Sequence, residues 1–172
     1  MNNIPVEKNK EYKVEIIDNG YEGEGIAKID DFTIFINGAI KGEICKILIV
    51  KINKSFAFGK LIEVLKPSEN RTIPDCSTYK RCGGCNLRHI KYEETLKIKK
   101  EMIQNLVNKS LNKKIDVNNV IGMENPYYYR NKLQYPVGKN KDGIPVMGVF
   151  ASRTHEIIPT QKCLIQNKKA QE

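Results

Sequence analysis

The chain has 172 residues, of which 40% are hydrophobic, and it carries a formal net charge of +9. A chain of this length can bury one moderate hydrophobic core or two small ones, because domains usually contain about 100–150 residues. The sequence has no apolar run near the roughly 20 residues of a membrane span, and its start lacks the apolar segment of a secretory signal. These features argue against membrane and secreted proteins and predict a cytoplasmic one.

The positive charge is unevenly distributed along the chain. Residues 1–75 contain eleven Lys and Arg against twelve Asp and Glu, whereas residues 76–172 contain eighteen against eight. A localised basic surface attracts phosphates and gains affinity by releasing counterions, which favours a nucleic-acid partner. The alternative is a solvated, lysine-rich surface without such a partner, because many lysines stand singly among Asn and Ile.

The first 66 residues are typical of β-structure. They contain five short runs rich in Val, Ile and Phe, separated by turn signals such as Asp-Asn-Gly and Asn-Gly. The expected strands are 12–17, 25–29, 32–36, 43–52 and 57–65. Strands of this number and spacing predict a five-stranded, closed or nearly closed barrel within residues 1–68. Cys45 lies in the fourth strand and is expected to be buried there.

Residues 69–172 predict a second, small α+β domain. A polar connector after Pro67 leads to Cys76. Residues 91–110 have apolar side chains near helical spacing and two glutamates near the start, which predicts an amphipathic helix. Further along, the sequence predicts strands at 127–138 and 144–150 joined by a turn at Asp142-Gly143, and another at 155–159. The fold class is therefore mostly β, with an α+β part.

Three of the five cysteines lie within ten residues of one another. Cys76, Cys82 and Cys85 have the spacing C-x5-C-x2-C, and Cys163 follows 78 positions after the last of them. In a reducing cytosol such a cluster is more often a metal site than a disulfide framework. The spacing suits both zinc and an iron–sulfur cluster, although zinc sites usually have two C-x2-C pairs. A redox C-x-x-C is disfavoured because the pair does not start a helix within a βαβ unit.

The order of motifs along the chain resembles the RNA uracil-C5 methyltransferases of the TrmA/RumA type. The motifs are GYEGEGIAKIDDFTIFINGAIKGE (20–43), CSTYKRCGGCNLRHI (76–90), KYEETLKIKK (91–100), YYYRNKLQYPVG (127–138) and QKC (161–163). The resemblance implies that the barrel is an OB-like TRAM domain. It also implies that Cys76, Cys82, Cys85 and Cys163 hold a [4Fe–4S] cluster, leaving Cys45 as the non-ligand. One departure is Arg88 before His89, where the family commonly has Gln.

The same resemblance implies a function. Family members use S-adenosylmethionine to methylate uracil in RNA, and ribosomal RNA is favoured over transfer RNA as the target here. The family's Rossmann-like catalytic domain has no counterpart among these residues. We therefore expect a fragment that binds RNA and a cluster but contains neither catalytic nor S-adenosylmethionine-binding residues. The alternatives are a non-catalytic RNA-binding protein with a structural zinc or iron–sulfur site, and a metal-stabilised protein-interaction module.

Six residues are candidates for RNA contact. Lys54 and Phe56 combine charge with an aromatic ring, a pairing that suits unpaired bases on an OB-like surface. The period of the strand equally allows Phe56 to be a core residue. The other candidates are cations beside the tyrosine run or the cysteines: Arg130, Lys132, Arg81 and Arg88. His89 is expected to be a structural hydrogen-bonding residue.

Overall fold

The computed structural model describes residues 4–111 and 114–171. The chain divides into two compact units, each described here by itself. The barrel unit comprises Met1–Thr72 and His89–Val120, and the cysteine unit comprises Ile73–Arg88 and Ile121–Glu172. The expected domains 1–68 and 69–172 stay a prediction; the compact units group residues 89–120 with the barrel.

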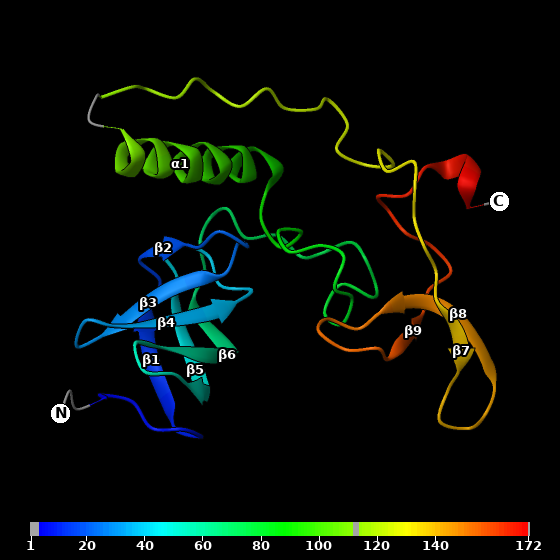
Figure 1. Ribbon diagram of the computed structural model, residues 1–172, viewed down its shortest axis with the longest axis horizontal. Helices are drawn as coiled ribbons and strands as arrows, with labels where there is room; N and C mark the ends of the chain where they lie inside the picture. The colour runs from blue at the N-terminus through cyan, green and yellow to red at the C-terminus, as the bar shows by residue number, and fades with distance from the viewer. Residues whose placement is uncertain (1–3, 112–113, 172) are drawn as a thin grey trace. The chain divides into compact units, whose positions relative to one another are not determined.

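The barrel unit contains a six-stranded sheet (Figure 1). Its strand order is β1-β5-β6-β4-β3-β2, and every pairing is antiparallel except that of β4 with β6. The strands are β1 (Glu11–Glu15), β2 (Asp18–Asn19), β3 (Gly25–Ile29), β4 (Phe32–Asn37), β5 (Ile44–Ile52) and β6 (Phe56–Lys66). Five of the six correspond to the predicted strands, and β2 is an additional two-residue strand.

The sheet closes on itself at the step from β1 to β2. The backbone N–H of Ile16 donates to the carbonyl of Glu43 at 2.9 Å, and that of Ile17 donates to the carbonyl of Ile26 at 2.8 Å. Consecutive residues are therefore bonded to β3 on one side and to the start of β5 on the other. These two bonds bring the ends of the sheet together, as the predicted OB-like barrel requires.

The barrel core consists of side chains that alternate along the strands. Three alternating side chains of β5 point into the core and are fully buried: Cys45, Ile47 and Ile49. The side chains between them therefore face outward. The other core residues include Val14, Ile16, Ala27, Ile34, Ile36 and Ala57. Burying each isoleucine contributes about 1.5–3 kcal/mol relative to leaving it exposed. Cys45 is thus a core residue, as predicted.

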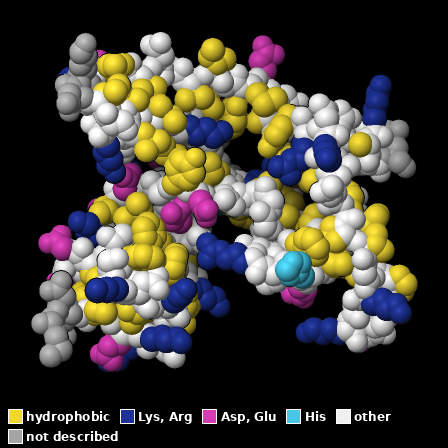
Figure 2. Space-filling model, viewed as in Figure 1, with side chains coloured by type: hydrophobic (Ala, Val, Ile, Leu, Met, Phe, Trp, Pro, Cys, Tyr) yellow, Lys and Arg dark blue, Asp and Glu magenta, His cyan; other side chains and the backbone are white. Residues whose placement is uncertain are grey.

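Helix α1 (Tyr92–Ser110) belongs to the barrel unit and confirms the predicted helix. Glu93 and Glu94 lie in its first turn, where negative charge is favourable. Glu101 accepts a hydrogen bond from Lys41 of the barrel at 3.3 Å. Figure 2 shows hydrophobic side chains around α1, and within the helix Ile103 and Leu106 are about half exposed. Within residues 4–111 and 114–171, none of the helices has the length and apolar character of a membrane span.

The cysteine unit contains a three-stranded antiparallel sheet in the order β7-β8-β9. Its strands are β7 (Val137–Lys139), β8 (Pro145–Phe150) and β9 (Ile157–Pro159). Gly143 has φ = 78° in the turn before β8, which fits the predicted turn at Asp142-Gly143. A single turn of 3-10 helix, η1 (Lys168–Ala170), follows the sheet.

The predicted strand over residues 127–138 is wrong for most of its length. Only its last two residues lie in β7. Tyr128 has φ = 56°, in the left-handed region that an extended strand cannot include. The segment instead pairs with residues 164–167, since the Tyr128 and Arg130 amides donate to the carbonyls of Leu164 and Ile165 at 3.0 and 2.8 Å.

Candidate nucleic-acid interface and cysteine site

Three phenylalanines gather on the outer surface of the barrel. Phe35 of β4 lies 5.5 Å from Phe56 of β6 between ring centroids, in an edge-to-face arrangement. Phe58 of β6 is 5.4 Å from Phe56 and 6.1 Å from Phe35. We call these residues the aromatic face. Sequence reasoning missed Phe35, because only the parallel pairing of β4 with β6 places it beside Phe58.

The aromatic face points away from the core. The neighbouring residues Ile34 and Ala57 are fully buried, so the alternating residues Phe35, Phe56 and Phe58 project outward and are half-buried. The alternative that Phe56 belongs to the core is therefore wrong. Partly exposed rings on a barrel present π-faces on which unpaired bases can stack.

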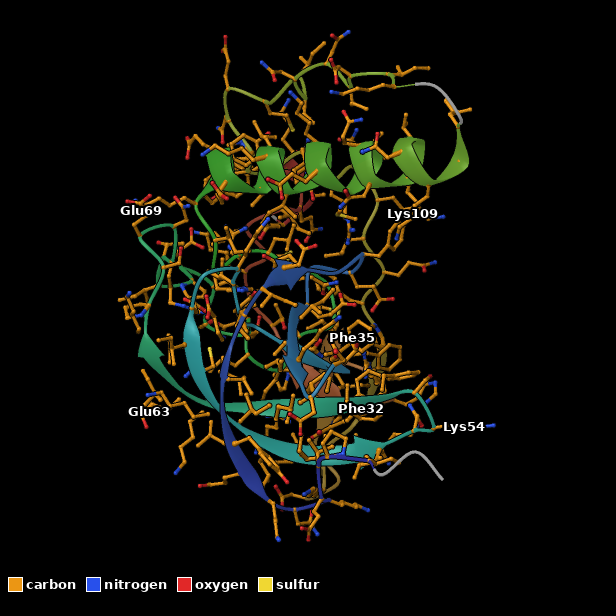
Figure 3. All side chains as sticks on the ribbon, turned by 90° about the vertical axis from the view of Figure 1, so that its left-hand side faces the viewer. Phe32, Phe35, Lys54, Glu63, Glu69 and Lys109 are labelled. Carbon is orange, nitrogen blue, oxygen red and sulfur yellow. The ribbon has the colours of Figure 1, made fainter. Side chains whose placement is uncertain are left out.

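Lysines surround the aromatic face. Lys51 of β5 lies opposite Phe58, and Lys60 follows the phenylalanines on the same side of β6. Lys54 occupies the loop between β5 and β6, where its side chain extends outward in Figure 3. On the side of the molecule that Figure 2 shows, Lys and Arg side chains are spread over the barrel with hydrophobic side chains between them. This mixture of cations and rings suits a flexible phosphate backbone with exposed bases.

The cysteine loop, residues 76–85, is a series of turns fixed to the end of β8. The amide of Cys82 donates to the Thr78 carbonyl at 2.9 Å, and that of Gly83 donates to the Phe150 carbonyl at 3.2 Å. A Cβ atom at Gly83 would lie 3.2 Å from the Cα of Ser152, so the close approach favours glycine. The amide of Gly84 donates to the Sγ of Cys82 at 3.3 Å, a contact that stabilises a thiolate.

All four candidate ligands are half-buried free thiols of one compact unit. Burial raises the pKa of Cys85, Arg88 lowers it, and the charges of Cys82, Cys163 and Cys76 raise it further. Cys163, distant in sequence, is therefore close enough to interact with the thiols of the loop. Burial raises the pKa of Tyr135, and the charges of Cys163 and Cys82 raise it further.

The donor set fits a group held by four thiolates. The number of thiols, their gathering in one unit and the N–H donor to Cys82 suit either an iron–sulfur cluster or zinc. In the described ranges, no group of three or more His, Cys, Asp or Glu side chains already has an arrangement that could hold a metal ion. The assignment of the four cysteines as ligands therefore stays a prediction, which the chemistry of the donors suits.

The four candidate cations of the cysteine unit have different surroundings. Arg81 forms a 2.7 Å ion pair with Glu156 at the surface. Arg88 has a side chain only 14% exposed and pairs with Asp75 at 2.5 Å, an interaction that lowers the pKa of Asp75. Lys132 is exposed, whereas Arg130 is half-buried. Of these four, Lys132 and Arg81 are the more accessible to a ligand.

Comparison with known proteins first defines the class of the barrel. Residues 5–62 match the TRAM domain family, so the barrel is a TRAM domain. This match agrees with the predicted fold and with the motif GYEGEGIAKIDDFTIFINGAIKGE.

Relatives extend the similarity to nearly the whole chain. The chain is 49% identical over 98% of its length to an uncharacterized RNA methyltransferase of Clostridium acetobutylicum, and 46% identical over 97% to one of Clostridium tetani. It is 45% identical over 91% of its length to another from Staphylococcus aureus. The chain spans 35–37% of the length of these relatives. The resemblance to RNA methyltransferases that the motifs predict is thereby confirmed.

A solved structure shares the fold. The tRNA (uracil-54, C5)-methyltransferase of Pyrococcus abyssi, in complex with S-adenosyl-L-homocysteine, matches with a TM-score of 0.60 and 17% identity. The match covers 92% of this chain and 34% of that one. At this identity the comparison concerns the fold alone.

Proposed function

We propose that this chain is the RNA-recognition part of an S-adenosylmethionine-dependent RNA uracil-C5 methyltransferase, with ribosomal RNA as the favoured target. The observation that carries the proposal is the 49% identity over 98% of the chain to a protein named an RNA methyltransferase. The TRAM domain and the aromatic face support the same function, because both suit RNA.

The proposed RNA site is the aromatic face with the lysines around it. Bases stack on Phe35, Phe56 and Phe58, while Lys51 and Lys54 attract the phosphates. Arg81, Arg130 and Lys132 provide further phosphate contacts in the cysteine unit. Duplex RNA keeps its bases within the helix, so this surface favours single-stranded segments.

Cys76, Cys82, Cys85 and Cys163 hold the proposed [4Fe–4S] cluster. When bound, the cluster supplies a covalent link between the cysteine loop and the segment at Cys163. Four thiolates leave no iron with an open coordination position, which favours a structural role. The residues themselves orient the loop: Gly84 donates to Cys82, and the Gly83 amide fixes the loop to β8.

The chain contains no thiol suited to attack on uracil. Methylation at C5 needs a thiolate that adds to C6 and a base that later removes the C5 proton. Four cysteines are assigned to the cluster, and burial raises the pKa of Cys45 to about 11 inside the barrel. We therefore propose that the 172 residues bind RNA without transferring a methyl group.

Two measurements test the proposal. The first compares binding of the chain to a labelled single-stranded RNA, the same RNA in a duplex, and an acidic peptide at several salt concentrations. We expect the single strand to bind most tightly and its affinity to fall with salt. Equal binding of the acidic peptide would refute the RNA site. The second measures iron, acid-labile sulfide and zinc after anaerobic purification. Stoichiometric zinc without sulfide would refute the [4Fe–4S] assignment.

A further inference from the structure

Arg88 is fixed from two sides inside the cysteine unit. Its Nε and Nη2 atoms donate to the Asp75 carboxylate at 2.5 and 3.2 Å. Its guanidinium also lies over the ring of Tyr127, 4.8 Å from the centroid. The Tyr127 hydroxyl donates to the same carboxylate at 2.9 Å. Each member of this triad thus contacts the other two, which is a rigid arrangement for a cation.

The triad connects the segments that carry the four thiols. Asp75 directly precedes Cys76, and Arg88 follows Cys85 by three residues, so their ion pair closes the cysteine loop at its two ends. Tyr127 begins the segment whose backbone pairs with residues 164–167, next to Cys163. A single set of side-chain contacts therefore links the loop to the segment next to the distant fourth cysteine.

The triad also places a permanent positive charge near the thiols. The Arg88 guanidinium is held by Asp75, the residue directly before Cys76, and Arg88 follows Cys85 by only three residues. An arginine stays charged at every pH at which the protein is folded. Several thiolates in one place repel one another, and a nearby cation reduces that cost.

We propose that Arg88, held by Asp75 and Tyr127, is a positioning residue that closes the cysteine loop and stabilises the anionic cluster site. This inference rests on the proposed cluster. It assigns to Arg88 a role different from the RNA contact expected from the sequence, because its side chain is 14% exposed and already engaged on both sides.

The first test needs no cluster. Amide hydrogen exchange of residues 76–85 is measured in the metal-free chain of 172 residues for Arg88→Gln, Asp75→Asn and Tyr127→Phe. We expect about fivefold faster exchange in the first two variants, as the loss of one partly exposed ion pair implies, and a smaller change in the third. Lys141→Gln, which removes a charge from an exposed turn of the same unit, serves as the control and keeps the wild-type rate. Wild-type rates in both Arg88→Gln and Asp75→Asn would overturn the positioning role.

The second test measures the midpoint reduction potential after anaerobic reconstitution with iron and sulfide. We expect Arg88→Gln to lower the potential, because a nearby positive charge favours the added electron, while Arg88→Lys keeps a potential close to wild type. Equal potentials in Arg88→Gln and wild type would overturn the electrostatic role. Exchange in the barrel strands reports whether each variant is folded. If the wild-type chain takes up no iron and sulfide, the proposed cluster fails, and hydrogen exchange alone decides whether Arg88 closes the loop.

Discussion

Glu43 and Arg71 form a bidentate ion pair at one end of the barrel, with both N–O distances at 2.6 Å. The Glu43 side chain is fully buried and also accepts hydrogen bonds from the backbone amides of Ile40 and Ser68 at 2.9 and 3.1 Å. Arg71 donates further to the Gly38 carbonyl at 2.7 Å. The pair therefore attaches the chain that leaves β6 to the turn between β4 and β5.

Glu43→Gln is expected to destabilise the barrel unit by about 3 kcal/mol. The substitution leaves the mostly buried Arg71 guanidinium without its counter-charge, and breaking a buried ion pair from one side is costly. Urea unfolding followed by far-UV circular dichroism measures the change. Glu63→Gln is the matched control on the exposed side of β6 (Figure 3) and should change the stability by less than about 0.5 kcal/mol. Similar effects of the two substitutions would contradict the role of the pair.

The buried His89 side chain is expected to make the barrel unit less stable in mild acid. Burial, reinforced by the charge of Arg71, lowers the pKa of His89 from 6.5 to about 4. The neutral imidazole is thus favoured in the folded state, so the unfolded chain takes up a proton first as the pH falls. The contribution of neutral His89 to the free energy of unfolding is fully present above pH 6.5. It is lost between pH 6.5 and 4 and amounts to about 3 kcal/mol.

The check is the free energy of unfolding measured at several pH values. His89→Gln should flatten the dependence between pH 6.5 and 4, whereas His155→Gln, at an exposed position, should preserve it. A second loss, which begins near pH 4.5, is expected from Glu43. Burial raises the pKa of Glu43, but its hydrogen bonds with Arg71, Ser68 and Ile40 outweigh this and lower the pKa below 4.5. An unchanged slope in His89→Gln would exclude His89 as the titrating group.

The sequence predicts those features that depend on local pattern. The five main strands and α1 follow from alternation, turn residues and helical spacing, all of which are short-range signals. The outward orientation of Phe56 does not follow, because a shift of one residue in a strand reverses its face, and the pairing of β6 with β5 changes register between Ile49 and Lys51. Tyr128 adopts a left-handed conformation next to a segment about 35 residues away, which no local pattern indicates. The partners of Arg88 are likewise decided by tertiary contacts.

Phe56→Ala is expected to weaken binding to single-stranded RNA about tenfold. Stacking of a base on an aromatic side chain contributes about 1–3 kcal/mol, and Phe56 contacts both other rings of the aromatic face. Fluorescence anisotropy with a labelled oligonucleotide measures the affinity. Tyr21→Ala removes an exposed ring from the turn between β2 and β3 and should leave the affinity unchanged. If both variants bind as wild type does, the bases do not stack on this face.

Replacing Lys51 or Lys54 with Gln should reduce the salt dependence of RNA binding. Each phosphate contact with a single strand contributes about 0.7 to the slope of log K against log salt concentration, so each variant should lose about that amount. The affinity should fall to a similar extent for RNAs of different sequence, because phosphates carry no sequence information. Glu63→Gln, with one negative charge fewer, should not reduce the slope. An unchanged slope in both lysine variants would place the phosphates elsewhere on the protein.

Cys163→Ser is expected to abolish stable iron binding, while Cys45→Ala should retain it. Cys163 is the only candidate ligand from the second half of the chain, and its charge acts on Cys85 of the loop. Cys45 is fully buried in the core of the barrel unit and is not part of the cysteine unit. Iron and acid-labile sulfide per chain after anaerobic reconstitution, together with the visible absorption of the cluster, give the result. The Cys45→Ala variant also controls for the loss of a thiol as such, so equal iron content in both variants would remove Cys163 from the ligand set.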